Sequence, residues 1–256
     1  MKLVTLRRLV VIPVVVFAVQ ALAPSALASH SWAGYHWART ANPFTLKLGD
    51  NLSSSWKPYL ATTSADWSES AVLDTTVVPG STSGRKCAAA TGRVQVCSDR
   101  YGSNGWLGIA TVWVNGAHIT KGAVKMNDTY FNKSAYNTPA WRNLVLCQEV
   151  GHTLGLDHQD ENFGNPNLGT CTDYTSNPET NQHPNDHDYA QLATVYSHLD
   201  TTTTIDGSPT SAQGSSGDRR QDDWGRAIRT GPDGRPVLFR RDLATGETQF
   251  TWVVWA

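Results

Sequence analysis

The 256-residue sequence lacks an excess of charge of either sign, apolar runs beyond its first residues, and internal repeats. It has 21 Lys and Arg against 22 Asp and Glu, a formal net charge of −1 that gives no electrostatic basis for binding nucleic acid. With 39% hydrophobic and 17% charged residues, it is neither a disordered polar chain nor a polytopic membrane protein. The lack of repeats excludes solenoids and propellers. We expect one globular domain with a substantial core, in a monomer.

Residues 1–28 have the pattern of an export signal. Lys2, Arg7 and Arg8 precede an apolar run over residues 9–19, and the Ala-Leu-Ala of residues 26–28 is a small-x-small cleavage site. The run is too short to span a bilayer comfortably, and no second run follows it. We therefore expect a secreted protein with no membrane segment after cleavage. A membrane anchor is the alternative.

The chain has only four cysteines, which export would place in an oxidising compartment. Four cysteines allow three pairings. We predict Cys87–Cys97, closing a short loop around a turn at 91–92, and Cys147–Cys171, tying a helix to a later loop. A free, reactive Cys147 is the competing interpretation.

Hydrophobic periodicity predicts an α+β domain in which a twisted sheet packs against helices. Strands are predicted at 44–48, 71–78, 92–97, 107–114 and 118–126, and Asn115-Gly116 predicts a hairpin between the last two. Apolar stripes at helical spacing predict helices at 53–67 and 188–199, with Asp186 as the cap of the second. This main domain is expected to cover residues 29–200.

The C-terminal part is expected to hold a linker and a small tail. Residues 201–217 are rich in Thr, Ser and Gly, which predicts a flexible linker that we extend to 222. Two predicted strands, 237–240 and 249–255, surround a turn at 245–246. The tail, 223–256, is therefore predicted to be a β-hairpin that docks on the main body, because about 35 residues are too few for a separate core.

A further helix is predicted between an N-cap at Thr138, followed by Pro139, and a stop at Gly155. Its apolar stripe leads into two polar residues on the same face, Gln148 and His152. Buried polar groups without partners cost about 1–3 kcal/mol each. These two side chains therefore require a partner.

Residues 148–158 read QEVGHTLGLDH. Helical spacing places Gln148 and His152 one turn apart, which suits two ligands of a tetrahedral metal, with Glu149 beside them near a metal-bound water. Gly155 can adopt positive φ and reverse the chain, so that His158 returns as a third ligand. Taken singly, Glu149 fits a solvated helix residue and His152 a core histidine, but the spacing to His158 favours a metal site.

This segment resembles the zinc signature H-E-x-x-H-x-x-G-x-x-H of the metzincin metalloproteases, and the order of elements over about residues 37–199 resembles their matrixin branch. The resemblance implies a metzincin-like fold with a twisted mixed sheet, an active-site helix, a Met-turn-like loop and a C-terminal helix. It also implies that His152 and His158 bind Zn²⁺ and that Glu149 is the general base. Gln148 stands where the family has a histidine. Its amide oxygen is a weaker zinc donor than imidazole, and it could instead hold a water that completes the coordination.

Residues 169–174 resemble the Met-turn, with Thr172 at the position of the methionine and Asp173 and Tyr174 after it. The predicted Cys147–Cys171 bridge would hold this loop against the active-site helix.

Several nearby residues leave alternatives open. His183 and His187 are alternative third ligands in place of Gln148. Asp160 and Glu161 fit either solvated loop carboxylates or a Ca²⁺ site. The other histidines are expected to be ordinary surface or packing residues: His30, His36, His118 and His198.

The resemblance implies a secreted zinc metalloendopeptidase whose polypeptide substrate binds in an extended conformation along an edge strand, at 110–114 or 118–124. The first alternative is a pseudo-protease that uses the cleft to bind peptides or proteins. Gln148 and Thr172 favour that alternative, and Glu149 argues against it. A third interpretation is a wall- or matrix-associated protein with the tail as its functional element.

Overall fold

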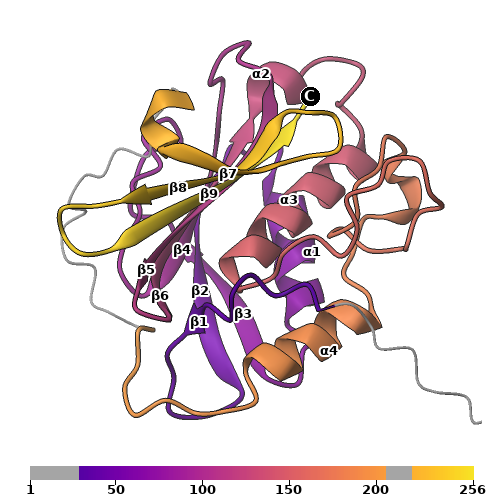
Figure 1. Cartoon of the computed structure of the whole chain (residues 1–256). Coiled ribbons are helices and arrows are strands. Elements are labelled where there is room, and N and C mark those ends of the chain that lie inside the picture. Colours follow the sequence, from indigo (N-terminus) through magenta and orange to yellow (C-terminus); the bar gives the residue numbers. More distant parts are fainter. Residues whose placement is uncertain (1–28, 206–220) are drawn as a thin grey trace, which may run out of the picture.

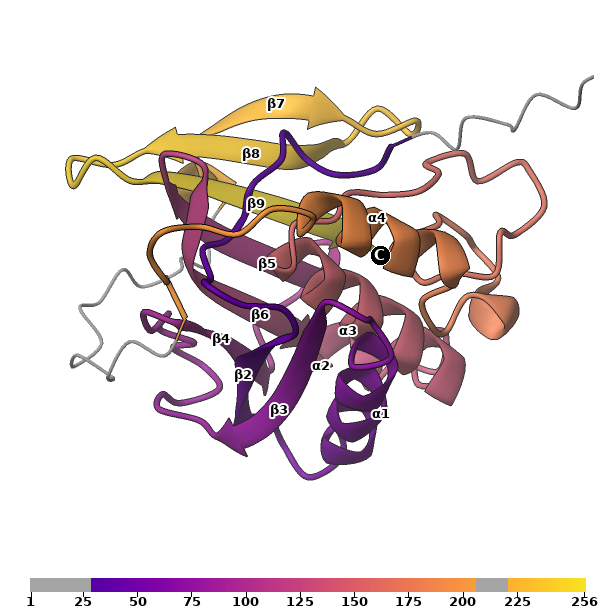
Figure 2. The ribbon, with the colours of Figure 1, turned by 90° about the horizontal axis from the view of Figure 1, so that it is seen from below.

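The computed structural model describes residues 29–205 and 221–256. The predicted export signal and the central part of the predicted linker lie outside these residues. The described part is an α+β structure, as predicted, with one mixed nine-stranded sheet and its main helices on one side (Figures 1 and 2).

The elements follow one another along the chain. The strands are β1 (His36–Trp37), β2 (Phe44–Asn51), β3 (Leu73–Pro79), β4 (Arg93–Asp99), β5 (Trp106–Asn115), β6 (His118–Asn127), β7 (Arg226–Thr230), β8 (Pro236–Asp242) and β9 (Thr248–Trp255). The α-helices are α1 (Lys57–Trp67), α2 (Asp128–Phe131), α3 (Pro139–Thr153) and α4 (Asp186–Val195), and short 3₁₀ turns lie at Pro178–Thr180 and Gln221–Trp224.

The sheet has the order β3-β2-β4-β6-β5-β9-β8-β7, and β1 pairs with the start of β6. Strands β2, β3, β4 and β6 are parallel to one another, whereas β5 runs antiparallel to β6 after the predicted Asn115-Gly116 turn. Figure 2 shows α1, α3 and α4 on the same side of this twisted sheet. The main core lies between the sheet and α1 and α3.

The helix α3 begins where the sequence predicts, because the Thr138 hydroxyl accepts a hydrogen bond from the Trp141 amide at 3.2 Å. The predicted cap of α4 is wrong by one residue: Asn185, not Asp186, is the N-cap. The Asn185 side chain accepts from the amide of Asp188, and the Asp188 carboxylate accepts from the amide of Asn185, forming a capping box.

Both predicted disulfides are confirmed, Cys87–Cys97 and Cys147–Cys171. The second bridge connects α3 to the loop at 169–174, so Cys147 is not a free thiol. Two disulfides indicate an oxidising environment. Within the described ranges, no helix is long and apolar enough to cross a membrane.

The C-terminal strands extend the main sheet. β8 and β9 form the hairpin around residues 245–246, and β7 precedes them as a further strand that the sequence analysis did not predict. β9 pairs with β5, and Phe250 and Trp252 join the main core beside Trp32. On the opposite face, Phe239 and Val253 belong to a second apolar cluster. The tail therefore contributes to the core on both faces of the sheet.

Candidate metal and active site

The end of α3 forms a tight turn that returns the chain toward the helix. Gly155 has φ of 98°, and a Cβ there would lie 2.4 Å from the Tyr35 carbonyl oxygen, so only glycine fits. The turn brings the Leu156 carbonyl under His152, whose Nδ1 lies 2.9 Å from that oxygen. The predicted reversal at Gly155 is therefore present.

His152 is fully buried at the last turn of α3. Since Nδ1 donates to Leu156, the other ring nitrogen, Nε2, carries the lone pair, and it has no hydrogen-bond partner among the described residues. Burial lowers the pKa of His152 to about 3, and the nearby His158 adds to the shift. The imidazole is therefore neutral at neutral pH, which is the form that binds metals.

His158 faces His152, with ring centroids 4.7 Å apart and ring planes at 84°. Its Nδ1 lies 2.8 Å from a carboxylate oxygen of Glu161, and its buried Nε2 is unpartnered within the described chain. A carboxylate behind a histidine is a common support of a metal ligand. In both histidines, therefore, a hydrogen bond at Nδ1 fixes the ring and leaves Nε2 available to a ligand.

Arg229 of β7 holds the loop that carries His158. Its guanidinium lies 2.5 and 2.6 Å from the two Asp157 carboxylate oxygens and 3.4 Å from Glu161. Burial would raise the pKa of Asp157, but hydrogen bonding to Arg229 outweighs it and holds that pKa well below its usual range. The pKa of Glu161 is also lowered. Burial would raise it, but the hydrogen bond from His158 and the charge of Arg229 outweigh burial.

Gln148 and Glu149 are buried on α3 one turn before His152. The Gln148 amide nitrogen and both Glu149 oxygens have no hydrogen-bond partner of normal geometry in the described part of the chain. Burial raises the pKa of Glu149 well above its ordinary value, and the Ala110 amide offsets this only partly. Glu149 has room here only because residue 108 is glycine. A Cβ at Gly108 would lie 2.6 Å from a carboxylate oxygen of Glu149.

The loop at 169–174 packs beneath this group. Thr172 is fully buried, and its hydroxyl donates to Asp188 of α4 at 2.8 Å. Asp173 accepts from the Leu168 amide and the Asn181 side chain, each at 2.8 Å. Thr172 therefore fixes the loop through a hydrogen bond.

Tyr174 lies against His158, with ring centroids 4.3 Å apart. Its buried hydroxyl has no partner in residues 29–205 or 221–256. Burial raises the pKa of Tyr174 well above its ordinary value, with the charge of Glu161 adding to the shift, so the phenol stays protonated.

The predicted substrate edge is wrong. Residues 110–114 belong to β5, which pairs with β6 on one side and β9 on the other, and residues 118–124 belong to β6, between β4 and β5. Trp252 of β9 pairs with Ala110, and its ring stacks on His152 at 5.1 Å and 14°. The sequence analysis took β5 for an edge strand because β9, the strand that covers it, lies about 140 residues later in the chain.

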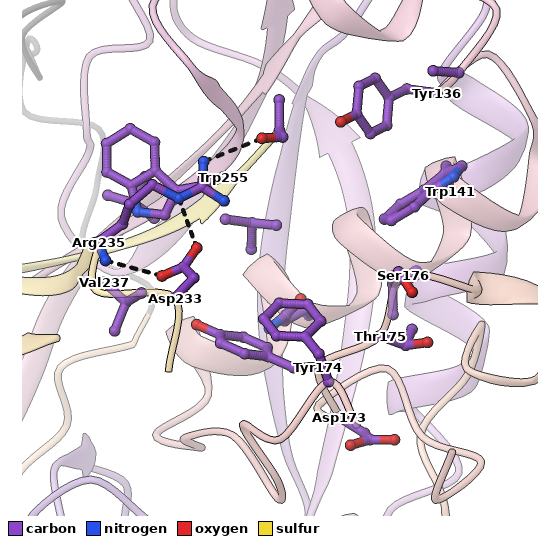
Figure 3. Close-up of a pocket in the computed structure, with 17 residues that line it drawn as sticks. Tyr136, Trp141, Asp173, Tyr174, Thr175, Ser176, Asp233, Arg235, Val237 and Trp255 are labelled. Atoms are coloured by element: carbon purple, nitrogen blue, oxygen red, sulfur yellow. Dashed lines mark hydrogen bonds and ion pairs between the residues drawn. The ribbon is translucent and has the colours of Figure 1, made fainter. Parts of the chain in front are cut away.

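A cavity of about 380 Å³ opens beside Gln148. Figure 3 shows its two sides, with Tyr136, Trp141 and residues 174–176 facing Asp233, Arg235 and Trp255 of the tail. Apolar side chains dominate the lining, and the Arg235–Asp233 ion pair lies on the tail side. The tail therefore forms one wall of the cavity next to the candidate site.

The alternative ligands lie elsewhere. His183 is half exposed and bonds to Asp66 at 2.8 Å, and the His187 ring lies against His30. Asp160 accepts from Asn162 and Asn165 of its own loop, and Glu161 is engaged by His158 and Arg229. We therefore propose no calcium site.

Sequence reasoning missed two tail residues that hold the site, Arg229 and Trp252. Neither has a local motif, because each acts through a tertiary contact with residues far away in the chain. The only available signal was the predicted docking of the tail on the main body.

No protein-family model matches the chain, and a search of curated proteins found no significant match.

Proposed function

We propose that the protein is a secreted, zinc-dependent metalloendopeptidase similar to the matrixin branch of the metzincins, in which Gln148 replaces one histidine ligand. One observation carries the proposal: buried polar atoms without partners gather at the end of α3, namely Nε2 of His152 and of His158 and both oxygens of Glu149. Each such atom costs about 1–3 kcal/mol if nothing satisfies it. Two imidazoles beside a carboxylate suit a zinc ion and its bound water.

The donor set fits zinc. His152 and His158 would bind through Nε2, since each ring is fixed by the hydrogen bond of its Nδ1. Gln148 would add its amide oxygen or hold a water. Arg229 and Trp252 would act as positioning residues, one through Asp157 and Glu161 and the other by stacking on His152.

A bound zinc ion would lower the pKa of its water to about 7 and polarise the scissile carbonyl. Glu149 would accept a proton from the attacking water and deliver it to the leaving amine, because no side chain of the described residues hydrogen-bonds to its carboxylate. The protonated hydroxyl of Tyr174 would donate a hydrogen bond to the substrate carbonyl.

The substrate would be a polypeptide that places an apolar or aromatic side chain in the cavity beside Gln148. The cavity volume of about 380 Å³ and its aromatic lining support this preference. Because β9 fills the free side of β5, the peptide would bind between α3, residues 174–176 and the tail.

The pseudo-protease remains the second candidate, and the position of β9 favours it. A strand of the same chain lies where the resemblance expects an extended substrate, and Trp252 covers one face of His152. The third interpretation, a separate adhesive tail, has less support because β9 contributes to the core.

Hydrolysis of casein by the purified mature chain tests the proposal. We expect cleavage that a zinc chelator abolishes, and a loss of at least about 100-fold in Glu149→Gln, since general-base catalysis contributes about 10²–10⁴-fold. Glu69→Gln, at an exposed carboxylate, is the matched control and should retain activity. Folded, zinc-loaded protein without cleavage would reject the protease and favour the binding module.

A further inference from the structure

Three histidines expected to be ordinary surface or packing residues come together near the turn between β5 and β6, where β1 pairs with the start of β6. His36 of β1 and His118 of β6 are partners in the parallel β1–β6 pair. His198 and Asp200 lie in the chain after α4. Two backbone hydrogen bonds hold this segment beside β1: Asp200 N to the Arg39 carbonyl and Thr204 N to the Ala38 carbonyl, each 2.9 Å.

His36, His198 and Asp200 form a compact triangle of donor atoms. His36 Nε2 lies 3.1 Å from His198 Nε2 and 3.5 Å from Asp200 Oδ1, and His198 Nε2 lies 3.8 Å from the same oxygen. Ligands of a tetrahedral zinc ion with bonds of about 2.0–2.2 Å are about 3.3–3.5 Å apart. The observed separations are close to those of three ligands around one ion.

The orientation of the His36 ring also fits a metal ligand. His36 Nδ1 lies 2.7 Å from the Gly34 carbonyl oxygen, which directs Nε2 at His198 and Asp200. A histidine whose second ring nitrogen is held by a backbone carbonyl is a common arrangement in metal sites. A metal ion between the three side chains would bind both Nε2 atoms and Asp200 Oδ1.

The carboxylate is already oriented. Arg39 donates to Asp200 Oδ2 from its guanidinium at 3.0 Å and from its backbone amide at 3.2 Å. His118 Nε2 lies 3.2 Å from Oδ1. His36 is buried, whereas the His198 side chain is 51% exposed, which gives an ion access from solvent.

We propose that His36, His198 and Asp200 bind a Zn²⁺ ion, with His118 and Arg39 holding the carboxylate in place. Two imidazoles and a carboxylate favour zinc over calcium or magnesium, which prefer all-oxygen sites. The ion fastens β1 to the segment after α4 and so acts as a structural site, separate from the candidate site at the end of α3. A water completes the coordination on the exposed side.

Metal content and thermal unfolding of the mature chain test this site. Elemental analysis after dialysis against buffered zinc should give one Zn²⁺ ion fewer per chain in His198→Ala than in the wild type, and a smaller zinc-dependent rise in Tm. The change is at a half-exposed side chain, so the variant should fold. His183→Ala is the matched control, because His183 is similarly exposed and also pairs with an aspartate, Asp66, but within the described residues it is in no cluster of metal-ligating side chains.

The result does not depend on the protease proposal. If both sites bind zinc, the wild type holds two ions and His198→Ala one. If the site at His152 and His158 binds none, the counts are one and none. Equal zinc content and equal Tm response in the wild type and His198→Ala would overturn the inference and leave the cluster as a hydrogen-bonded network.

Discussion

Gln148 is the residue that most distinguishes this chain from the zinc signature it resembles. Its side chain is buried next to His152, and its amide nitrogen has no partner among residues 29–205 and 221–256. An amide oxygen is a neutral and weaker zinc donor than an imidazole. If the candidate site binds zinc as proposed, the identity of this one side chain limits its affinity.

We predict that Gln148→His raises zinc affinity by at least about tenfold, because it adds a third imidazole at ligand spacing on α3. Competition with a chromophoric chelator, in the His198→Ala background, would measure this site alone. Gln182→His, in a loop, should leave the affinity unchanged. An unchanged or lower affinity in Gln148→His would show that residue 148 does not lie in the ligand shell.

At the scale of single residues, the sequence predicted those contacts of the candidate site that depend on local spacing. His152, Gly155 and His158 lie within seven residues of one another, so helix and turn geometry were enough to bring them together. The cluster of His36, His198 and Asp200 could not be predicted, because His36 is about 160 residues from the other two and meets them only through the packing of β1 beside the chain after α4.

At the scale of elements, α4 is fixed to the loop beneath the candidate site by one buried carboxylate. Asp188 accepts from His30 at 2.9 Å, from Thr172 at 2.8 Å and from the Asn185 amide at 2.8 Å, as well as from Thr170. Burial would raise the pKa of Asp188, but these hydrogen bonds outweigh it and lower that pKa below 3.8. The ionised carboxylate is therefore the form that stabilises the fold.

We predict that Asp188→Asn lowers the free energy of unfolding at pH 7 by about 1–3 kcal/mol, since it weakens hydrogen bonds to a buried charged group. Because the folded pKa is depressed, the contribution of Asp188 is complete above the unfolded pKa and is lost as the pH falls through the folded pKa. The difference from wild type should therefore shrink in urea unfolding at about pH 3. Asp186→Asn, exposed in the same helical turn, should have little effect. A difference that persists unchanged in acid would contradict this account.

The elements themselves were largely predictable, and their ends less so. Alternating apolar residues placed β2 to β6 within a few residues, and the Thr138-Pro139 pair placed the start of α3. The cap of α4 was displaced because Asn185 and Asp186 are both good capping residues, and the choice depends on which side chain reaches the amide of Asp188. β7 was missed because most of its residues are exposed, so it has no apolar alternation.

For the whole molecule, the main question is whether the C-terminal strands are an appendage or part of one cooperative unit. The sheet continues from β5 to β7, and Trp252 is fully buried between Trp32 and His152. Removing a buried aromatic side chain typically costs about 3–5 kcal/mol. If the tail and the main domain fold together, this substitution will destabilise both of them.

We therefore predict that Trp252→Ala lowers the free energy of unfolding of the entire chain by about 3–5 kcal/mol while denaturation by guanidinium remains a single transition. Ile228→Ala, at a side chain that is 42% exposed on β7, should change it by no more than about 0.5 kcal/mol. Circular dichroism follows the sheet and helices together, and hydrogen exchange of α3 reports on the main domain by itself. If the variant shows a separate early transition with α3 still protected, the tail is an independent unit. If α3 loses protection together with β9, the predicted division into a domain and a docked tail gives way to one cooperative fold.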